Sequence, residues 1–167
     1  MTDILADRRH LLLAALPLAM LGSARATPLN PAETIITLPE QIPWQARPGW
    51  PTNSVISAPL FGHRDQPGLY YELIKWYPGY MSAPHTYLTD RLCVVVSGTW
   101  WVNSGADFDP ARCRKVPAGS FVHRVAGTPH YDGVIASGTE PVVIAICGMA
   151  PVHMAYVEAH KPGWRKL

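Results

Sequence analysis

Four side chains in two separate segments of this 167-residue chain could do chemistry together: His85, Tyr87, Arg91 and His130. Neutral imidazoles are ligands for Zn, Fe, Mn, Ni and Cu. A phenol is either a further ligand or an acid/base group, and a guanidinium binds carboxylates through two parallel hydrogen bonds. These residue types predict a divalent or trivalent transition metal held by His85, Tyr87 and His130. Tyr87 and Arg91 are then the predicted catalytic groups, and Arg91 also binds the substrate.

These side chains meet only if the segments that carry them are strands of a barrel. Residues two apart on a strand project to one face, so His85 and Tyr87 point the same way, and Arg91 joins them if the strand is unbroken. A small barrel turns such a face inward around a ligand-sized cavity, which His130 can reach from a distant strand. We also predict that His123 binds substrate in this pocket, although alternation alone does not fix which strand face is inside.

Tyr87 and Arg91 each have a structural alternative. In the structural alternative, Tyr87 forms part of the pocket wall, and its hydroxyl group makes a hydrogen bond to one of the histidines. As a metal ligand it would have to ionise, and its reference pKa near 10 restricts that role to a strong Lewis acid such as Fe(III). Arg91 is otherwise a buried cation paired with Asp90 or Asp132. The residue types leave both alternatives open.

The rest of the chain predicts a β-sandwich or β-barrel. Prolines interrupt it too often for a helical bundle, because proline breaks helix interiors. Strand-like segments bounded by turn residues are predicted at 54–60, 69–77, 84–88, 91–97, 99–103, 120–125, 130–136, 141–147 and 152–158. Ser97-Gly98 predicts a tight hairpin between the strands that flank it. An edge strand is predicted at 34–38, and residues 152–161 fit either a helix or a strand.

The two chemistry-bearing segments resemble the two motifs of the cupin superfamily. From Gly79 the chain reads G-x5-H-x-Y-x3-R-x6-G, and from Gly119 it reads G-x5-V-x-G-x2-H. The cupin motifs are G-x5-H-x-H-x3-E-x6-G and G-x5-P-x-G-x2-H-x3-N. The stretch from HTYLTDR to SGTWW is also similar to small bacterial single-domain cupins. Over roughly residues 60–160, the resemblance implies an all-β, cupin-type double-stranded β-helix, which is a jelly-roll barrel, in one domain that commonly dimerises.

The sequence departs from the cupin pattern where metal binding would be decided. Tyr87 replaces the second histidine and Arg91 replaces the glutamate, so only His85 and His130 match the family's metal-binding positions. Two function classes follow. In the first, the protein is a metal-dependent enzyme of dioxygenase, isomerase, decarboxylase or lyase type that uses Fe, Mn, Zn or Ni on a small organic acid. In the second, it is a metal-free, non-catalytic module that binds or senses a small molecule.

The first 26 residues have the layout of a secretory signal. Arg8 and Arg9 precede a short apolar run, and a small-x-small cleavage site follows. The paired arginines resemble a twin-arginine signal, with an ordinary Sec signal as the alternative, and both routes predict a periplasmic bacterial protein. The predicted organisation is a signal peptide at 1–26, a Pro-rich arm at 27–53, the cupin barrel at 54–160 and a tail at 161–167.

The charge of the predicted mature chain limits its partners. Without residues 1–26, Lys and Arg exceed Asp and Glu by one, and no basic run is present. This balance excludes a nucleic-acid footprint and a membrane-surface patch. The remaining partners are a small-molecule ligand, a metal and a second copy of the chain.

Overall fold

Short strands separated by turns make up almost all of the regular structure. The structure is a computed structural model that describes residue 30 and residues 32–167. The predicted signal peptide lies outside these residues. The strands are β1 Gln45–Ala46, β2 Val55–Phe61, β3 Gly68–Trp76, β4 Tyr80–Ser82, β5 His85–Tyr87, β6 Arg91–Ser97, β7 Thr99–Ser104, β8 Arg114–Pro117, β9 Phe121–Arg124, β10 His130–Val134, β11 Val142–Ala150, β12 Met154–Tyr156 and β13 Trp164–Lys166. Two single-turn 3-10 helices, η1 Pro39–Gln41 and η2 Pro110–Arg112, complete the described elements.

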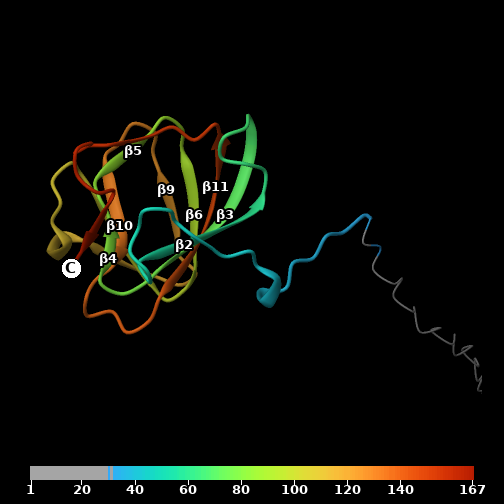
Figure 1. The fold of residues 1–167 in the computed structure, drawn as a ribbon, viewed down its shortest axis with the longest axis horizontal. Helices are drawn as coiled ribbons and strands as arrows, with labels where there is room; N and C mark the ends of the chain where they lie inside the picture. The colour runs from blue at the N-terminus through green and yellow to red at the C-terminus, as the bar shows by residue number, and fades with distance from the viewer. Residues whose placement is uncertain (1–29, 31) are drawn as a thin grey trace, which may run out of the picture. The chain divides into compact units, whose positions relative to one another are not determined.

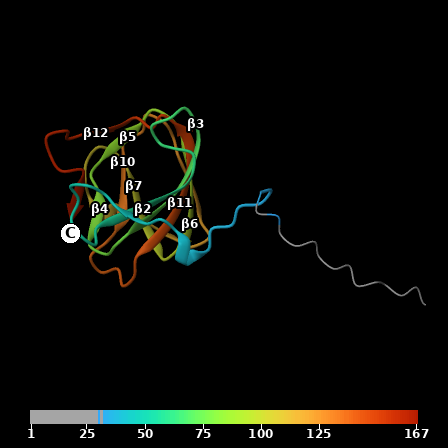
Figure 2. The same cartoon turned by 45° about the vertical axis from the view of Figure 1, so that its right-hand side comes forward.

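The strands form two antiparallel sheets within the compact unit of residues 37–167. One sheet has the order β1-β2-β3-β11-β6-β9, and the other has the order β12-β5-β10-β4-β13, with β7 and β8 attached through β10. Figure 1 shows β5, β10 and β4 on one side and β6, β11 and β3 on the other, and Figure 2 shows the same two layers from a second direction. The prediction of an all-β jelly roll is confirmed.

The core lies between the two sheets. Trp100 and Tyr70 are almost fully buried there, together with aliphatic residues such as Val95 and Ile144. Alternation along β6 shows how the sequence defines this core, because Cys93 and Val95 are buried while their strand neighbours are exposed. The burial of each large apolar side chain contributes about 1.5–3 kcal/mol to the stability of the fold. The alternation of apolar and polar residues therefore determines which face of each sheet points into the core.

All nine predicted strands are present within a few residues of their expected bounds. The segment 152–161, which fitted either a helix or a strand, contains the strand β12. The edge strand predicted at 34–38 is wrong, since those residues have no regular structure. Strands β1, β4, β8 and β13 were not predicted. β1 has only two residues, and the other three have three or four residues and contain or adjoin proline or glycine, so none of them carries a readable alternation.

The hairpin predicted at Ser97-Gly98 is also wrong. β6 pairs with β11 and β9, whereas β7 pairs with β10 and β8, so the chain crosses from one sheet to the other at this turn. Gly98 has φ 74°, and a Cβ there would lie 2.5 Å from the Pro141 carbonyl oxygen. Glycine is therefore required for the close backbone approach at the crossing.

The predicted arm and tail each supply a strand to the sheets. β1 from the arm pairs with β2, and β13 from the tail pairs with β4. Among the described residues, no helix has the length and apolar character needed to cross a membrane.

Candidate metal and ligand site

A cavity of about 30 Å³ lies between the sheets. Its charged and polar lining consists of Arg47, Ser82, His85, Tyr87, Arg91, Arg124, Asp132 and Tyr156, and its other walls include Trp76, Trp100, Ile144 and Ile146. A buried water needs roughly 10–15 Å³ of such space. The cavity therefore has room for an ion and a few ligand atoms next to the polar wall.

His85 and His130 face each other across two neighbouring strands. They are register partners in the β5–β10 pair, their ring centroids are 4.4 Å apart, and both side chains are buried. The Nδ1 of His85 lies 2.8 Å from the Ala83 carbonyl oxygen, and the Nδ1 of His130 lies 2.9 Å from that of Thr128. Because a carbonyl oxygen only accepts, each Nδ1 carries the proton, and each Nε2 keeps a free lone pair.

Burial also keeps these rings neutral. It lowers the pKa of His85 to about 4, with the neighbouring His130 acting in the same direction. Burial and the Arg124 charge lower the pKa of His130 as well. Metal ligation requires the neutral imidazole, so both groups are ready to bind a metal at pH 7 without losing a proton.

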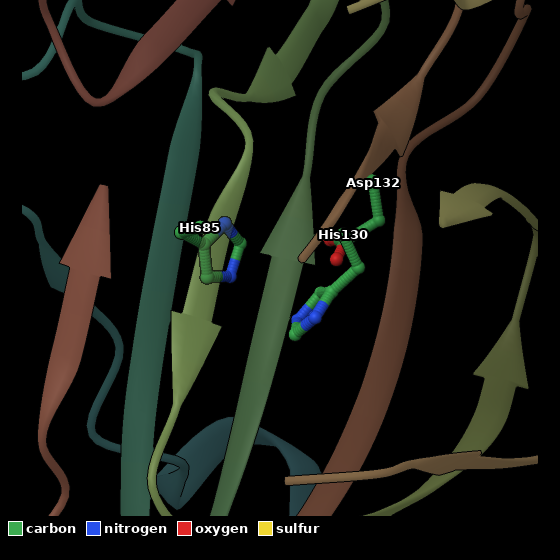
Figure 3. Close-up of side chains that lie close together, drawn as sticks. All are labelled: His85, His130 and Asp132. Carbon is green, nitrogen blue, oxygen red and sulfur yellow. The ribbon is translucent and has the colours of Figure 1, made fainter. Parts of the chain in front are cut away.

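Asp132 is a third donor that sequence reasoning missed. One ligand atom from each of His85, His130 and Asp132 can be chosen so that all three lie within 4.8 Å of one another. Figure 3 shows Asp132 beside His130 on the same strand and His85 on another. The signal was present, because residues 130 and 132 are two apart on one strand and must share a face. Two imidazoles and one carboxylate form the donor set typical of non-heme Fe(II) sites, so the residues present fit a transition metal.

The carboxylate of Asp132 already has two partners. Trp100 Nε1 donates to its Oδ1 at 3.2 Å, and Arg124 Nη2 donates to its Oδ2 at 3.3 Å. Each carboxylate oxygen can accept about two hydrogen bonds, so a lone pair stays available on each. These partners orient the carboxylate in the way that the surroundings of metal ligands usually do.

Tyr87 lies next to the histidines, as strand parity predicts, whereas the strand is not continuous to Arg91, which reaches Tyr87 from β6 in the other sheet. The buried Tyr87 ring is 5.1 Å from the His85 ring and 5.7 Å from the His130 ring, measured between centroids. The Arg91 guanidinium carbon lies 4.2 Å from the centroid of the Tyr87 ring, a cation–π contact. The structure thus brings both side chains to the cavity, and their catalytic roles stay predictions.

Arg91 is paired with neither of its expected partners. Its Nη2 donates to Glu72 Oε1 at 3.1 Å and its Nε donates to the Tyr70 hydroxyl at 3.1 Å, both from β3. Burial works to lower the pKa of Arg91, but Tyr87, Tyr70 and Glu72 together raise it above its ordinary value. Arg91 is therefore a charged, hydrogen-bonded part of the wall.

The structure does not bring His123 to the cavity. On β9 it pairs in register with Leu92, and both side chains are exposed, whereas the adjacent Arg124 points inward. The Nε2 of His123 lies 2.8 Å from Asp90 Oδ2 on the outer surface. The expectation that His123 lies in the pocket is corrected, because alternation placed it on the outer face.

We predict that His85 makes the protein less stable in acid. The His85 imidazole takes up a proton near pH 6.5 in the unfolded protein and only near pH 4 in the folded protein. The unfolded state therefore binds more protons between these pH values. Its contribution to the free energy of unfolding is complete above pH 6.5, and about 3 kcal/mol is lost as the pH falls to about 4. Urea titrations of metal-free protein at pH 7 and 4.5 measure this loss.

The control for this prediction is a pair of histidine variants. His85→Gln should show a smaller difference between the two pH values than the wild type, while His153→Gln, at an exposed residue, should match the wild type. Equal pH dependence in the wild type and His85→Gln would contradict the prediction.

Comparisons with known proteins identify the architecture. No protein-family model and no curated protein sequence matches the chain. The polyketide cyclase RemF from Streptomyces resistomycificus has a TM-score of 0.54 at 12% identity, over 77% of this chain and 81% of that one. The DMSP lyase DddQ from Ruegeria pomeroyi has a TM-score of 0.56 at 11% identity, over 72% and 64%. An RmlC-like cupin from Shewanella frigidimarina has a TM-score of 0.52 at 13% identity, over 70% and 90%.

The chain has the cupin fold. Within it, the histidines at the two motif positions, His85 and His130, come from β5 and β10 and lie side by side, and His85 lines the cavity. Gly79, Gly98 and Gly119, the glycines at the ends and starts of the two motifs, all have positive φ.

Proposed function

We propose that this cupin-fold protein binds a small organic acid in its interior, next to a mononuclear transition metal. The observation that carries the proposal is the cluster of His85, His130 and Asp132, whose donor atoms lie within 4.8 Å of one another beside the cavity. Fe, Mn, Zn and Ni all accept imidazole ligands, and a bound ion of this kind would act as a Lewis acid on a substrate oxygen.

The chain's own residues would prepare the acid for reaction. His85 and His130 present their free Nε2 atoms because their Nδ1–H groups donate to backbone carbonyls. The phenol of Tyr87 lies beside both imidazoles, where it can serve as a further ligand or hold a proton for transfer to the substrate. Aromatic side chains form an apolar wall on this side of the cavity, and a low-polarity wall strengthens the electrostatic contacts inside it.

The reaction class we propose is that of a dioxygenase, lyase or isomerase. Two proteins that share the fold, RemF and DddQ, are by name a polyketide cyclase and a DMSP lyase. Their names support an enzyme that acts on a small molecule.

A specific observation favours a second candidate, a metal-free binding or sensing module. Asp132 already accepts hydrogen bonds from Arg124 and Trp100, and Arg91 lies at the position of the cupin glutamate. In this candidate the buried arginines bind the ligand and no metal takes part.

We also propose that the protein is exported to the periplasm and forms a homodimer. The signal pattern of residues 1–26 supports export. Exposed apolar side chains on the outer face of the six-stranded sheet, including Leu92, Val94 and Phe121, support pairing with a second copy.

Metal loading tests the proposed function. Metal-free protein is incubated with Fe(II), Mn(II), Zn(II) or Ni(II) separately, desalted, and measured by elemental mass spectrometry. We expect about one ion per chain for at least one metal. Retention far below one ion per chain for all four metals would favour the metal-free module.

A further inference from the structure

The lining of the cavity carries excess positive charge. Arg47, Arg91 and Arg124 line it, and Asp132 is the only carboxylate among its lining residues in the described chain. The cavity therefore favours an anionic ligand. Arg47 is only partly buried, so the open question is which of the two buried arginines, Arg91 or Arg124, receives it.

Two of the three guanidinium nitrogens of Arg91, which the sequence favours, already have hydrogen-bond partners. Its Nε donates to Tyr70 and its Nη2 donates to Glu72, whose carboxylate also accepts from Arg64 at 3.2 Å and 3.4 Å. Glu72 is 3% exposed, so the charge pair is held inside the protein. Binding a ligand carboxylate at these donors would require Arg91 to leave Glu72 and Tyr70.

Arg124 has a buried donor without a hydrogen-bond partner. Its Nη1 donates to the Asn103 carbonyl oxygen at 3.2 Å and its Nη2 donates to Asp132. Its Nε is the only fully buried side-chain nitrogen or oxygen without a hydrogen-bond partner in the part of the chain that the structure describes. The residue is 8% exposed and lines the cavity. Buried donors without an acceptor are rare in folded proteins, and each calls for an explanation.

We propose that Arg124 is the residue that recognises the anionic group of the ligand, with its Nε–H donating to a carboxylate oxygen. The inference rests on the proposed function, because it names the recognition residue of the same cavity. The bond to Asp132 fixes the guanidinium beside the candidate metal ligands. A carboxylate held there would lie next to the histidine pair, which fits a small acid whose charged end enters the cavity.

Nitrogen-15 NMR of arginine side chains tests this proposal in metal-free wild-type protein. The Nε–H signals of Arg124 and Arg91 are assigned through their own side-chain carbons, and the protein is titrated with formate and separately with formamide. The two probes have equal numbers of heavy atoms and differ in charge. We expect formate to shift the Arg124 Nε–H signal along a saturable one-site curve, at least tenfold more tightly than formamide, and to leave the Arg91 signal in place.

Two variants complete the test. Arg124→Lys keeps a cation beside Asp132 but lacks Nε–H, so formate affinity measured by calorimetry should fall at least tenfold. Arg114→Lys, at an exposed residue, should retain the wild-type affinity. If Arg124→Lys does not fold, the wild-type titration alone decides.

The results separate the two proposals. An unmoved Arg124 signal, an equal response to formamide, or a saturable shift at Arg91 would overturn the assignment even if the protein binds metal. Because the titration uses metal-free protein, a failure to load metal would leave a positive formate result standing.

Discussion

Replacing His85 and His130 together by alanine should abolish metal binding. The two residues supply both imidazole nitrogens of the candidate site, and each Nε2 is left free by a hydrogen bond at Nδ1. Loss of a residue that only supports a ligand typically lowers metal affinity about 10–100-fold. Removal of two ligands should therefore lower it by more than about 100-fold. The metal content after desalting, measured by elemental mass spectrometry, should fall from about one ion per chain to background.

The matched control is the double variant His153→Ala, His160→Ala. Both of these histidines are exposed and lie outside the cavity lining. This variant loses the same number of imidazoles, so its metal content should equal that of the wild type. If both double variants lose metal equally, the ion was held by surface histidines and the interior site is wrong. Circular dichroism spectra should confirm that each variant remains folded.

Asp132→Ala should destabilise the fold by about 3–5 kcal/mol, the range measured when one partner of a buried ion pair is removed. The carboxylate is the acidic partner of the buried Arg124 and the acceptor for the indole N–H of Trp100. Alanine would leave a cation and a donor buried without their acceptors, in a region closed by both sheets. Urea denaturation at pH 7 of metal-free protein, read by tryptophan fluorescence, measures the loss.

Asp90→Ala is the control for this effect. Asp90 also pairs with a basic side chain, His123, but both groups are about half exposed, and surface pairs contribute little. Its removal should cost clearly less than that of Asp132. A second variant, Asp132→Asn, keeps an oxygen acceptor and removes the charge, so it should be less destabilising than alanine. Equal losses of stability for Asp90→Ala and Asp132→Ala would show that burial does not increase the contribution of the Asp132–Arg124 pair to stability.

The architecture could be predicted because local patterns determine most of it. Runs of β-branched and aromatic residues between prolines and glycines indicate strands, and the motif glycines Gly79, Gly98 and Gly119 have the positive φ that suits turns. The partners of each strand could not be predicted in the same way. The turn at Gly98 resembles a hairpin locally, but the packing of two sheets sends the chain across to the other layer.

Strand parity and motif spacing predicted only part of the site. Parity placed His85 and Tyr87 together, and the motif spacing added His130. The partner of Arg91 was missed because Glu72 lies 19 residues away on another strand. Asp132 was considered only as a partner for an arginine, although it shares a strand face with His130. Non-local contacts of this kind depend on the pairing of strands, which a single sequence does not reveal.

The pairing of β13 with β4 has a consequence for how the protein is made. β4 ends at residue 82 and its partner begins at residue 164, and both figures show the C-terminus beside β4. During synthesis, β4 leaves the ribosome long before β13. The edge of the sheet at β4 therefore stays unpaired until β13 has been made. Folds built from such distant pairings form slowly. The second sheet is therefore completed only after residue 166 has emerged, and most of the chain is exposed to chaperones and proteases before its interior closes.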